Sequence, residues 1–291
     1  MSASSVAEEF RNDSDRVRSV KVRIPAPHHK LDGFELAGTL DLPAHADEST
    51  KVAMVAHCFT CTRNAPGAAR ISKELASNGV AVLRFDFAGL GDSIPEQDIE
   101  GGMFSRTTFS TNVKDLLAGY RWLERNYHAP ILMVGHSWGG PAVIHAADNC
   151  AAVRAVATVG SPFNPHHVIE RMEGTIEELQ NDKSLERAQM EGRDLWIGRA
   201  FLDELETHTD ESSAQAVAAL GKSRRGLCVL HSPIDDYVDV SNAKQILDAA
   251  VQPASMIALP MADHLLMKKG TATRAGQLIY AWARPLFVGR D

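Results

Sequence analysis

A serine at position 137 lies in the pentapeptide GHSWG, which fits the pattern G-x-S-x-G. The apolar run ILMV comes directly before this pentapeptide, and the helix-like sequence GGPAVIHAADN begins at its last glycine. In such a strand–turn–helix context the serine oxygen is exposed at the top of a sheet, close to the positive end of a helix dipole. Gly135 and Gly139 suit the tight turn because they carry no side chain. The pattern therefore predicts a nucleophile elbow around Ser137.

A serine nucleophile needs a general base, and the base needs a carboxylate that orients it. After a strand–turn–helix serine, the acid comes before the histidine in the chain. Asp235 follows the apolar run LCVL and His264 follows the run MIAL, so both are expected at the carboxyl ends of buried strands. We therefore predict a catalytic triad of Ser137, Asp235 and His264. Asp236, directly beside Asp235, is the competing acid.

Two backbone N–H groups would have to stabilise the negative oxygen of a tetrahedral intermediate. We expect one from Trp138, directly after the serine, and the other from Phe59, in the loop after the first inner strand. His57 begins this loop and lies too early in the chain to be the base. We expect His57 to anchor the loop instead.

Cys58 and Cys61 flank Phe59 in a C-x-x-C pattern, which occurs in redox and zinc sites. A redox motif of the thioredoxin type would open a helix after a strand, whereas this segment is already needed for the oxyanion loop. A zinc site would require a second C-x-x-C or H-x₃-H pair. We therefore expect two small thiols that fill space, with Cys58 at the substrate pocket, and a redox role is the alternative.

The elements that must position these residues follow from the apolar pattern. Short apolar runs with little alternation are typical of parallel strands buried on both faces, and helical patterns separate them. The expected strands cover residues 52–56, 80–85, 131–134, 153–159, 227–230 and 256–259, and the expected helices cover about 66–78, 109–127, 139–149, 241–250 and 271–284. Residues 20–24 alternate between apolar and charged side chains, and residues 34–42 also fit a strand, so the two segments suggest an antiparallel hairpin at a sheet edge. The pattern predicts an α/β fold with a mostly parallel sheet and helices on both faces.

Residues 162–225 interrupt this pattern, because they contain many acidic residues and amphipathic pieces but no clear buried strand. A long insertion in a doubly wound sheet is typical of a cap over a site. Trp196 and Phe201 are its candidate walls of a substrate pocket. The expected organisation is a core over 17–161 and 226–291, a cap over 162–225 and a flexible N-terminal arm over 1–16.

Composition excludes several classes of protein. The net charge of −7 and the lack of a dense Lys/Arg block argue against a nucleic-acid partner. No apolar run approaches the ~18 residues that a membrane helix requires, and residues 1–16 lack the apolar region of a secretory signal. Four cysteines in 291 residues fall short of a disulfide framework and favour a reducing compartment. We therefore expect a cytoplasmic protein that needs no cofactor or metal, and a homo-oligomer stays open.

The segments HCFTCTRN, LRFDFAGLGDS, GHSWGG, HSPIDDYV and ADHLL resemble the α/β-hydrolase superfamily. More closely, they resemble the hydrolase half of bacterial proteins that fuse such a domain to an OsmC-like peroxidase domain, and they are similar to cinnamoyl/feruloyl-type esterases. This resemblance covers residues from about 50 to 160 and from 226 to 288. It implies a functional association with an OsmC-like peroxidase. It also implies the catalytic roles already predicted for Ser137, Asp235, His264 and the amides of Phe59 and Trp138.

The reaction that we predict is hydrolysis of a small or medium acyl ester through an acyl-serine intermediate. The same triad could hydrolyse a thioester, an amide or a peptide bond. The alternative of another class is a hydrolase fold that only binds a ligand or a partner under the cap. The presence of all the triad residues argues against that alternative, because a binding module has no use for them.

Overall fold

The computed structural model describes residues 17–96, 98 and 102–287, and the flexible arm predicted for residues 1–16 lies outside them. Within these residues, one sheet of eight strands has the order β1-β2-β4-β3-β5-β6-β9-β10. The pairs β1–β2 and β2–β4 are antiparallel, and all other neighbours are parallel. This confirms the predicted mostly parallel sheet with an antiparallel N-terminal hairpin. The strands are β1 (Arg18–Pro25), β2 (Glu35–Leu42), β3 (Lys51–Ala56), β4 (Val80–Phe85), β5 (Ile131–His136), β6 (Val153–Val159), β9 (Gly226–His231) and β10 (Ala254–Ala258).

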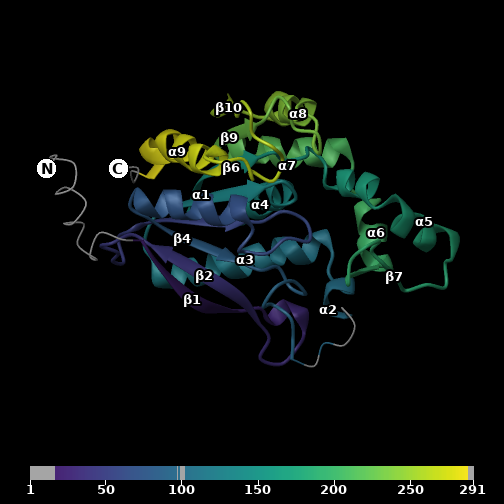
Figure 1. Cartoon of the computed structure of the whole chain (residues 1–291). Helices are drawn as coiled ribbons and strands as arrows, with labels where there is room; N and C mark the ends of the chain where they lie inside the picture. Colours follow the sequence, from purple (N-terminus) through teal and green to yellow (C-terminus); the bar gives the residue numbers. More distant parts are fainter. Residues whose placement is uncertain (1–16, 97, 99–101, 288–291) are drawn as a thin grey trace, which may run out of the picture.

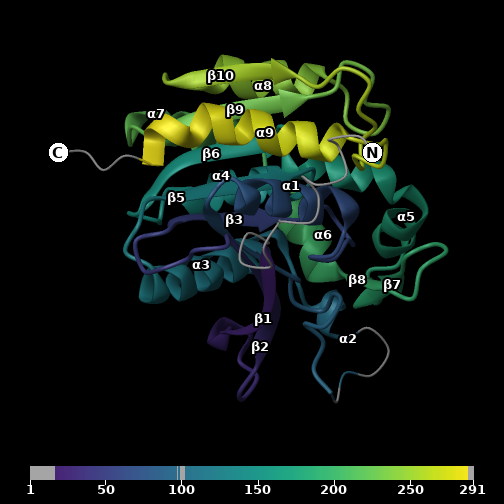
Figure 2. The ribbon, with the colours of Figure 1, turned by 60° about the vertical axis from the view of Figure 1, so that its left-hand side comes forward.

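Helices cover both faces of the sheet, as Figures 1 and 2 show. The helices α1 and α9 pack together on one face, and α3, α4, α7 and α8 cover the other. In the described residues, no helix combines the length and the apolar character that a membrane crossing requires. The helices of these layers are α1 (Pro66–Ser77), α3 (Phe109–Asn126), α4 (Gly139–Ala147), α7 (Asp210–Lys222), α8 (Ser241–Ala249) and α9 (Thr271–Ala283), and the shorter pieces are η2 (Pro27–His29), α2 (Gly102–Ser105) and η4 (Arg284–Phe287).

The inner strands are buried on both faces, which explains their continuous apolar runs. In β3, the side chains of Val52 and Met54 enter the apolar layer under α3 and α4, whereas Ala53 and Val55 enter the layer under α1 and α9. All of these side chains are buried. Because alternate residues of a strand point to opposite faces, both sets must be apolar.

The strand β10 departs from this expectation. It pairs with β9 alone and forms the edge of the sheet, where Met256 is 40% exposed. The prediction of a strand buried on both faces is wrong here, because an edge strand has a neighbour on one side only. A four-residue apolar run does not distinguish an edge strand from an inner one.

The segment between β6 and β9 projects beyond the sheet, at the right of Figure 1. The side-chain amide of Asn164 donates to the carbonyl oxygen of His208 at 3.3 Å and to the Asp210 carboxylate at 3.0 Å, so the chain enters and leaves this projection at neighbouring points. The helix that follows, α7, packs against α4 and α8. The projection contains η3 (Pro165–Arg171), α5 (Glu173–Asn181), the antiparallel pair β7 (Arg187–Gln189) and β8 (Trp196–Gly198), and α6 (Arg199–Leu205).

Candidate active site

Ser137 lies in a sharp turn between β5 and α4. Its φ angle is +53°, in the left-handed region that non-glycine residues rarely adopt. A Cβ atom at Gly139 would lie 2.6 Å from the carbonyl oxygen of Ala56, and one at Gly135 would collide with the carbonyl of Gly139. The N–H of Ser137 donates to the carbonyl oxygen of Val159 at 2.9 Å. The strand β5, its neighbours β3 and β6, and the helix α4 therefore fix the turn together.

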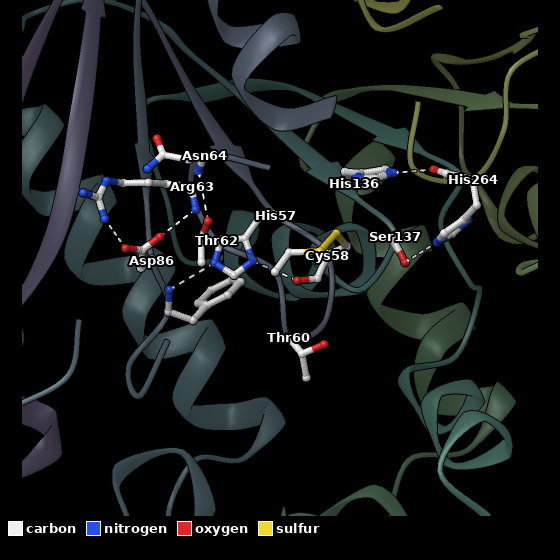
Figure 3. The surroundings of a disulfide bond; sticks show 12 residues. His57, Cys58, Thr60, Thr62, Arg63, Asn64, Asp86, His136, Ser137 and His264 are labelled. Atoms are coloured by element: carbon white, nitrogen blue, oxygen red, sulfur yellow. Dashed lines mark hydrogen bonds and ion pairs between the residues drawn. A yellow bond between two sulfur atoms is a disulfide. The ribbon is translucent and has the colours of Figure 1, made fainter. Parts of the chain in front are cut away.

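The structure brings Ser137, His264 and Asp235 together, each from the carboxyl end of a different strand. Nε2 of His264 lies 2.9 Å from Oγ of Ser137 (Figure 3), and its Nδ1 lies 2.9 Å from Oδ2 of Asp235. Because a carboxylate only accepts hydrogen bonds, Nδ1 carries the proton and donates it. Nε2 is then free to accept the proton of the serine hydroxyl.

The backbone around Asp235 keeps its carboxylate charged. Its Oδ1 accepts the N–H groups of Tyr237 and Val238, both at 2.9 Å. Burial alone would raise the pKa of Asp235, but hydrogen bonds from His264 and from these two N–H groups outweigh it and hold the pKa below its usual value. Asp236 is exposed and lines the adjacent cavity instead. The geometry therefore favours Asp235 as the partner of the histidine.

His136 is a functional candidate that the sequence analysis missed. Its Nε2–H donates to the backbone carbonyl of His264 at 2.8 Å (Figure 3), and the two rings lie 5.6 Å apart between centroids. Burial, and after it the nearby His264, lower the pKa of His136 to about 4, so the ring stays neutral near pH 7. His136 is thus a neutral donor that positions the segment carrying His264. Its place directly before Ser137 was the available signal.

The loop after β3 is fixed at both ends. At its start, Nδ1–H of His57 donates to the carbonyl of Cys58 at 2.8 Å, and Nε2 accepts the N–H of Phe87 at 3.2 Å. Burial lowers the pKa of His57, which keeps its ring neutral for these two roles. At the far end, the buried guanidinium of Arg63 forms an ion pair with the buried carboxylate of Asp86 (Figure 3). These contacts hold the loop against the sheet.

The two predicted oxyanion donors lie on this loop and on the elbow. Phe59 and Trp138 both lie in turns, and within the described residues their N–H groups donate to no backbone carbonyl. The rings of the two residues are in edge contact, with centroids 5.1 Å apart, so the two segments are neighbours. In the described part of the chain, both N–H groups thus lack a backbone acceptor, as oxyanion donors would.

Cys58 and Cys61 are joined by a disulfide, which Figure 3 shows beside the nucleophile. The expectation of two separate thiols is wrong, because the chain turns back between them: the N–H of Cys61 donates to the carbonyl of Cys58 at 3.1 Å, and their Cα atoms are 5.3 Å apart. Thr60, inside this turn, has a φ angle of +54°. The helix α1 begins only at Pro66, so the motif does not open a helix. Because these two cysteines form a disulfide, they do not support the expectation of a reducing compartment.

A cavity of about 350 Å³ lies directly over Ser137 and His264. A second cavity of about 610 Å³ adjoins it under the projection, since Phe59, Thr60, Arg193 and Tyr237 line both. The lining of the first cavity includes both cysteines of the disulfide and residues that follow β9 and β10. It is lined by Cys58, Phe59, Thr60, Cys61, Ser137, Arg193, Asp236, Tyr237, Asp263, His264, Leu265 and Met267.

The two aromatic residues expected in the pocket wall lie elsewhere. Trp196 is half-buried on β8 under the guanidinium of Arg187, and it lines neither of the two cavities. Phe201 is buried against the rings of Phe59 and Trp138, with centroids 5.6 and 5.8 Å away. Phe201 therefore packs against the two residues that are predicted to supply the oxyanion donors. The amphipathic pattern could not distinguish this packing from contact with a substrate.

A further group of residues consists of side-chain types that can bind a metal ion. His28 and His29 each place Nε2 next to the same carboxylate oxygen of Asp115, at 2.8 and 2.7 Å. Two imidazoles and one carboxylate are ligands that suit zinc and other transition metals. Hydrogen bonds account for the same contacts, and the other oxygen of Asp115 accepts the N–H of Ala88 at 3.1 Å. None of these residues lines the two cavities at the candidate active site.

Comparison with known proteins agrees with this architecture. Residues 53–275 match the sequence model of the Alpha/beta hydrolase family. The esterase domain of a Rhodothermus marinus protein is similar to this chain, with 34% identity, a TM-score of 0.67, and coverage of 92% of this chain and 98% of that domain. None of the curated proteins matches the chain.

Two further solved structures share the fold at lower identity. Est1E from Butyrivibrio proteoclasticus is 18% identical, with a TM-score of 0.69, and the match covers 91% of this chain and 99% of Est1E. Dienelactone hydrolase from Anabaena variabilis is 17% identical, with a TM-score of 0.63, and the match covers 94% of this chain and 100% of that enzyme. The likeness therefore extends over almost the whole of each chain.

Proposed function

The chain belongs to the alpha/beta hydrolase family, and from this premise we propose that it is a serine hydrolase that cleaves carboxylic esters. The observation that carries the proposal is the continuous hydrogen-bond chain from Asp235 through His264 to Ser137, with 2.9 Å at each link. An oriented base within hydrogen-bond reach is what a serine needs to become a nucleophile. The similarity to an esterase domain at 34% identity supports an ester as the substrate.

In the first step, Nε2 of His264 takes the hydroxyl proton of Ser137 while the serine oxygen attacks the carbonyl carbon of the ester. Asp235 stabilises the imidazolium that forms. The negative oxygen of the tetrahedral intermediate accepts hydrogen bonds from the N–H groups of Phe59 and Trp138, and each such donor is worth about 10²–10³ in kcat. The intermediate then collapses, the alcohol leaves with the proton from His264, and an acyl-serine remains.

In the second step, a water molecule attacks the acyl group, and His264 accepts its proton. Collapse of the second tetrahedral intermediate releases the carboxylic acid and returns Ser137 to its hydroxyl form. The cavity of about 350 Å³ over the serine fits a small or medium acyl group, and Phe59, Leu265 and Met267 give it apolar walls. Est1E has been solved with ferulic acid bound, which makes hydroxycinnamate esters the aromatic substrates to compare with simple acyl esters.

The proposal is tested by labelling the protein with a fluorophosphonate probe and mapping the modified residue by mass spectrometry. We expect the label on Ser137, and we expect Ser137→Ala to lose hydrolysis of p-nitrophenyl butyrate by about 10⁶ in kcat. Ser223→Ala, at an exposed helix end, is the matched control and should keep the wild-type rate. Normal turnover by a folded Ser137→Ala protein would refute the assignment. Binding of esters without any turnover by the wild type would favour the non-catalytic alternative.

A further inference from the structure

The disulfide between Cys58 and Cys61 opens onto the catalytic cavity. Both cysteines line the cavity of about 350 Å³ that also contains Ser137 and His264. Cys58 is 3% exposed, whereas Cys61 is half-buried, so Cys61 is the more accessible of the two residues to a reagent in the cavity. A small thiol can therefore enter by the same route as the substrate.

The disulfide closes the turn that presents the predicted oxyanion donor. Phe59 and Thr60 are the two residues inside the ring, and the N–H of Phe59 is the donor in question. Thr60 has a φ of +54°, which a β-branched residue adopts only when its surroundings hold it there. Non-covalent contacts also act on this turn. The carbonyl of Cys58 accepts the N–H of Cys61 and Nδ1–H of His57, and Arg193 of the projection donates to Thr60 Oγ1. The ring of Phe59 packs against its aromatic neighbours Phe104, Trp138 and Phe201.

The rest of the loop is held independently of the disulfide. His57 is fixed by Phe87, and Arg63 is fixed by Asp86, on the two sides of the cysteine pair. Breaking the disulfide therefore removes the covalent link across Phe59 and Thr60 without unfolding the loop. Once released, Thr60 can relax toward negative φ, which rotates the adjoining Phe59–Thr60 peptide group and thereby shifts the Phe59 backbone that carries the predicted oxyanion donor.

We propose that Cys58–Cys61 is a reversible thiol–disulfide exchange site in the active-site wall, that it reacts with dithiols, and that the oxidised form is the active form of the enzyme. The inference rests on the proposed ester hydrolysis, because that is the activity it controls. The other two cysteines do not compete. Cys150 and Cys228 are buried, and burial raises the pKa of each thiol to about 12, so neither forms the thiolate that exchange requires.

The exchange runs in two balanced steps. A thiolate of the dithiol attacks Sγ of Cys61, the Cys58–Cys61 bond breaks, and the electron pair leaves on Cys58 as a thiolate. The second thiolate of the same dithiol then attacks its own sulfur in the mixed disulfide and releases Cys61 as a thiolate. The protein gains two electrons and, after protonation of both thiolates, two protons. The dithiol becomes a cyclic disulfide.

The reduced form should lose turnover more than substrate binding. The N–H of Phe59 acts on the oxyanion, which exists in the intermediate and not in the bound ester, so its displacement lowers kcat. Complete loss of one donor costs about 10²–10³ in kcat, and a donor that is only displaced should cost about 10- to 100-fold. We expect kcat to fall by more than KM rises, because the lining residues outside this turn, from Ser137 and from the segments after β9 and β10, stay in place.

The experiment uses the whole protein with dithiothreitol as the dithiol and p-nitrophenyl butyrate as the substrate. Under native conditions, alkylation and mass spectrometry should find new thiols on Cys58 and Cys61, with kcat reduced about 10- to 100-fold. Oxidised glutathione should restore both the bond and the rate. Cys61→Ser should show the low rate with or without dithiothreitol. Cys150→Ser, the matched control, should respond as the wild type does.

Two results would overturn the inference. A disulfide that resists dithiothreitol in the folded protein is not an exchange site, and full alkylation of Cys58 and Cys61 with an unchanged kcat shows that the bond does not control the oxyanion site. Neither result needs a variant, so a misfolded Cys61→Ser protein would not obscure it. Loss of ester hydrolysis in both redox states would count against the proposed function instead, while the alkylation would still decide the exchange.

Discussion

Replacing Asp235 by asparagine tests the hydrogen bond between Asp235 and Nδ1 of His264. In the wild type, Oδ1 of Asp235 accepts the N–H groups of Tyr237 and Val238, and the carboxylate accepts Nδ1–H of His264. An asparagine would keep its oxygen on the two backbone donors. Its NH₂ group would then face Nδ1 of the histidine, which must become an acceptor. The ring proton moves to Nε2 and points at Ser137, so the base is blocked.

The magnitude follows from this change of tautomer. Loss of the orienting carboxylate with preserved geometry lowers kcat by about 10⁴, which corresponds to about 5.4 kcal/mol of transition-state stabilisation. The neighbouring variant Asp236→Asn is the matched control. Because its side chain is exposed and lies outside the hydrogen-bond chain, we expect its kcat to stay within about threefold of the wild type.

The assay is steady-state hydrolysis of p-nitrophenyl butyrate at pH 7–8, with thermal unfolding of each variant as the check on folding. A folded Asp235→Asn protein within about tenfold of the wild-type kcat would refute the tautomer argument. A larger loss in Asp236→Asn than in Asp235→Asn would move the acid to position 236. Equal large losses in both would show that the whole turn after β9, and not one carboxylate, orients the histidine.

Two further predictions concern residues that contact the predicted catalytic residues without lining the cavity. His136→Ala removes the donor to the His264 carbonyl and should lower kcat for p-nitrophenyl butyrate about 10- to 100-fold. His136→Gln can still donate this hydrogen bond and should recover most of the rate. Equal losses of kcat in both variants would contradict this role. Phe201→Ala removes a buried ring that packs against both Phe59 and Trp138 and should lower the free energy of unfolding by about 3–5 kcal/mol, measured by chemical denaturation. A loss below about 1 kcal/mol would show that this part of the projection is loosely packed.

The sequence predicted the parts that depend on apolar pattern and chain order. Runs such as ILMV before Ser137 are buried on both faces of a parallel sheet, and this burial leaves few alternatives to a strand. The order of serine, acid and histidine along the chain then indicates which residues follow neighbouring strands. The structure brings Ser137, Asp235 and His264 to the same point, which is what that order implies.

The parts that escaped prediction depend on backbone conformation that no pattern encodes. The disulfide forms because a turn containing Thr60 in the left-handed region brings Cys58 and Cys61 together, and threonine gives no sequence signal for that conformation. The choice between Asp235 and Asp236 depends on which carboxylate faces inward, and adjacent residues have the same local pattern. The cytoplasmic location, the absence of a nucleic-acid partner, a homo-oligomer and the association with an OsmC-like peroxidase stay predictions.

The two ends of the projection lie next to each other, and this has a consequence for how the protein could diversify. Because Asn164 contacts His208 and Asp210, the forty or so residues between them start and finish at one point of the framework. The crossover from β6 through α7 to the parallel strand β9 is complete without them. Doubling the length of a closed loop adds only about 0.6 kcal/mol of closure entropy. Evolution can therefore exchange, shorten or enlarge this segment as a module. Such a change would alter the part of the cavity that the projection covers, while the residues at the strand ends stay the same.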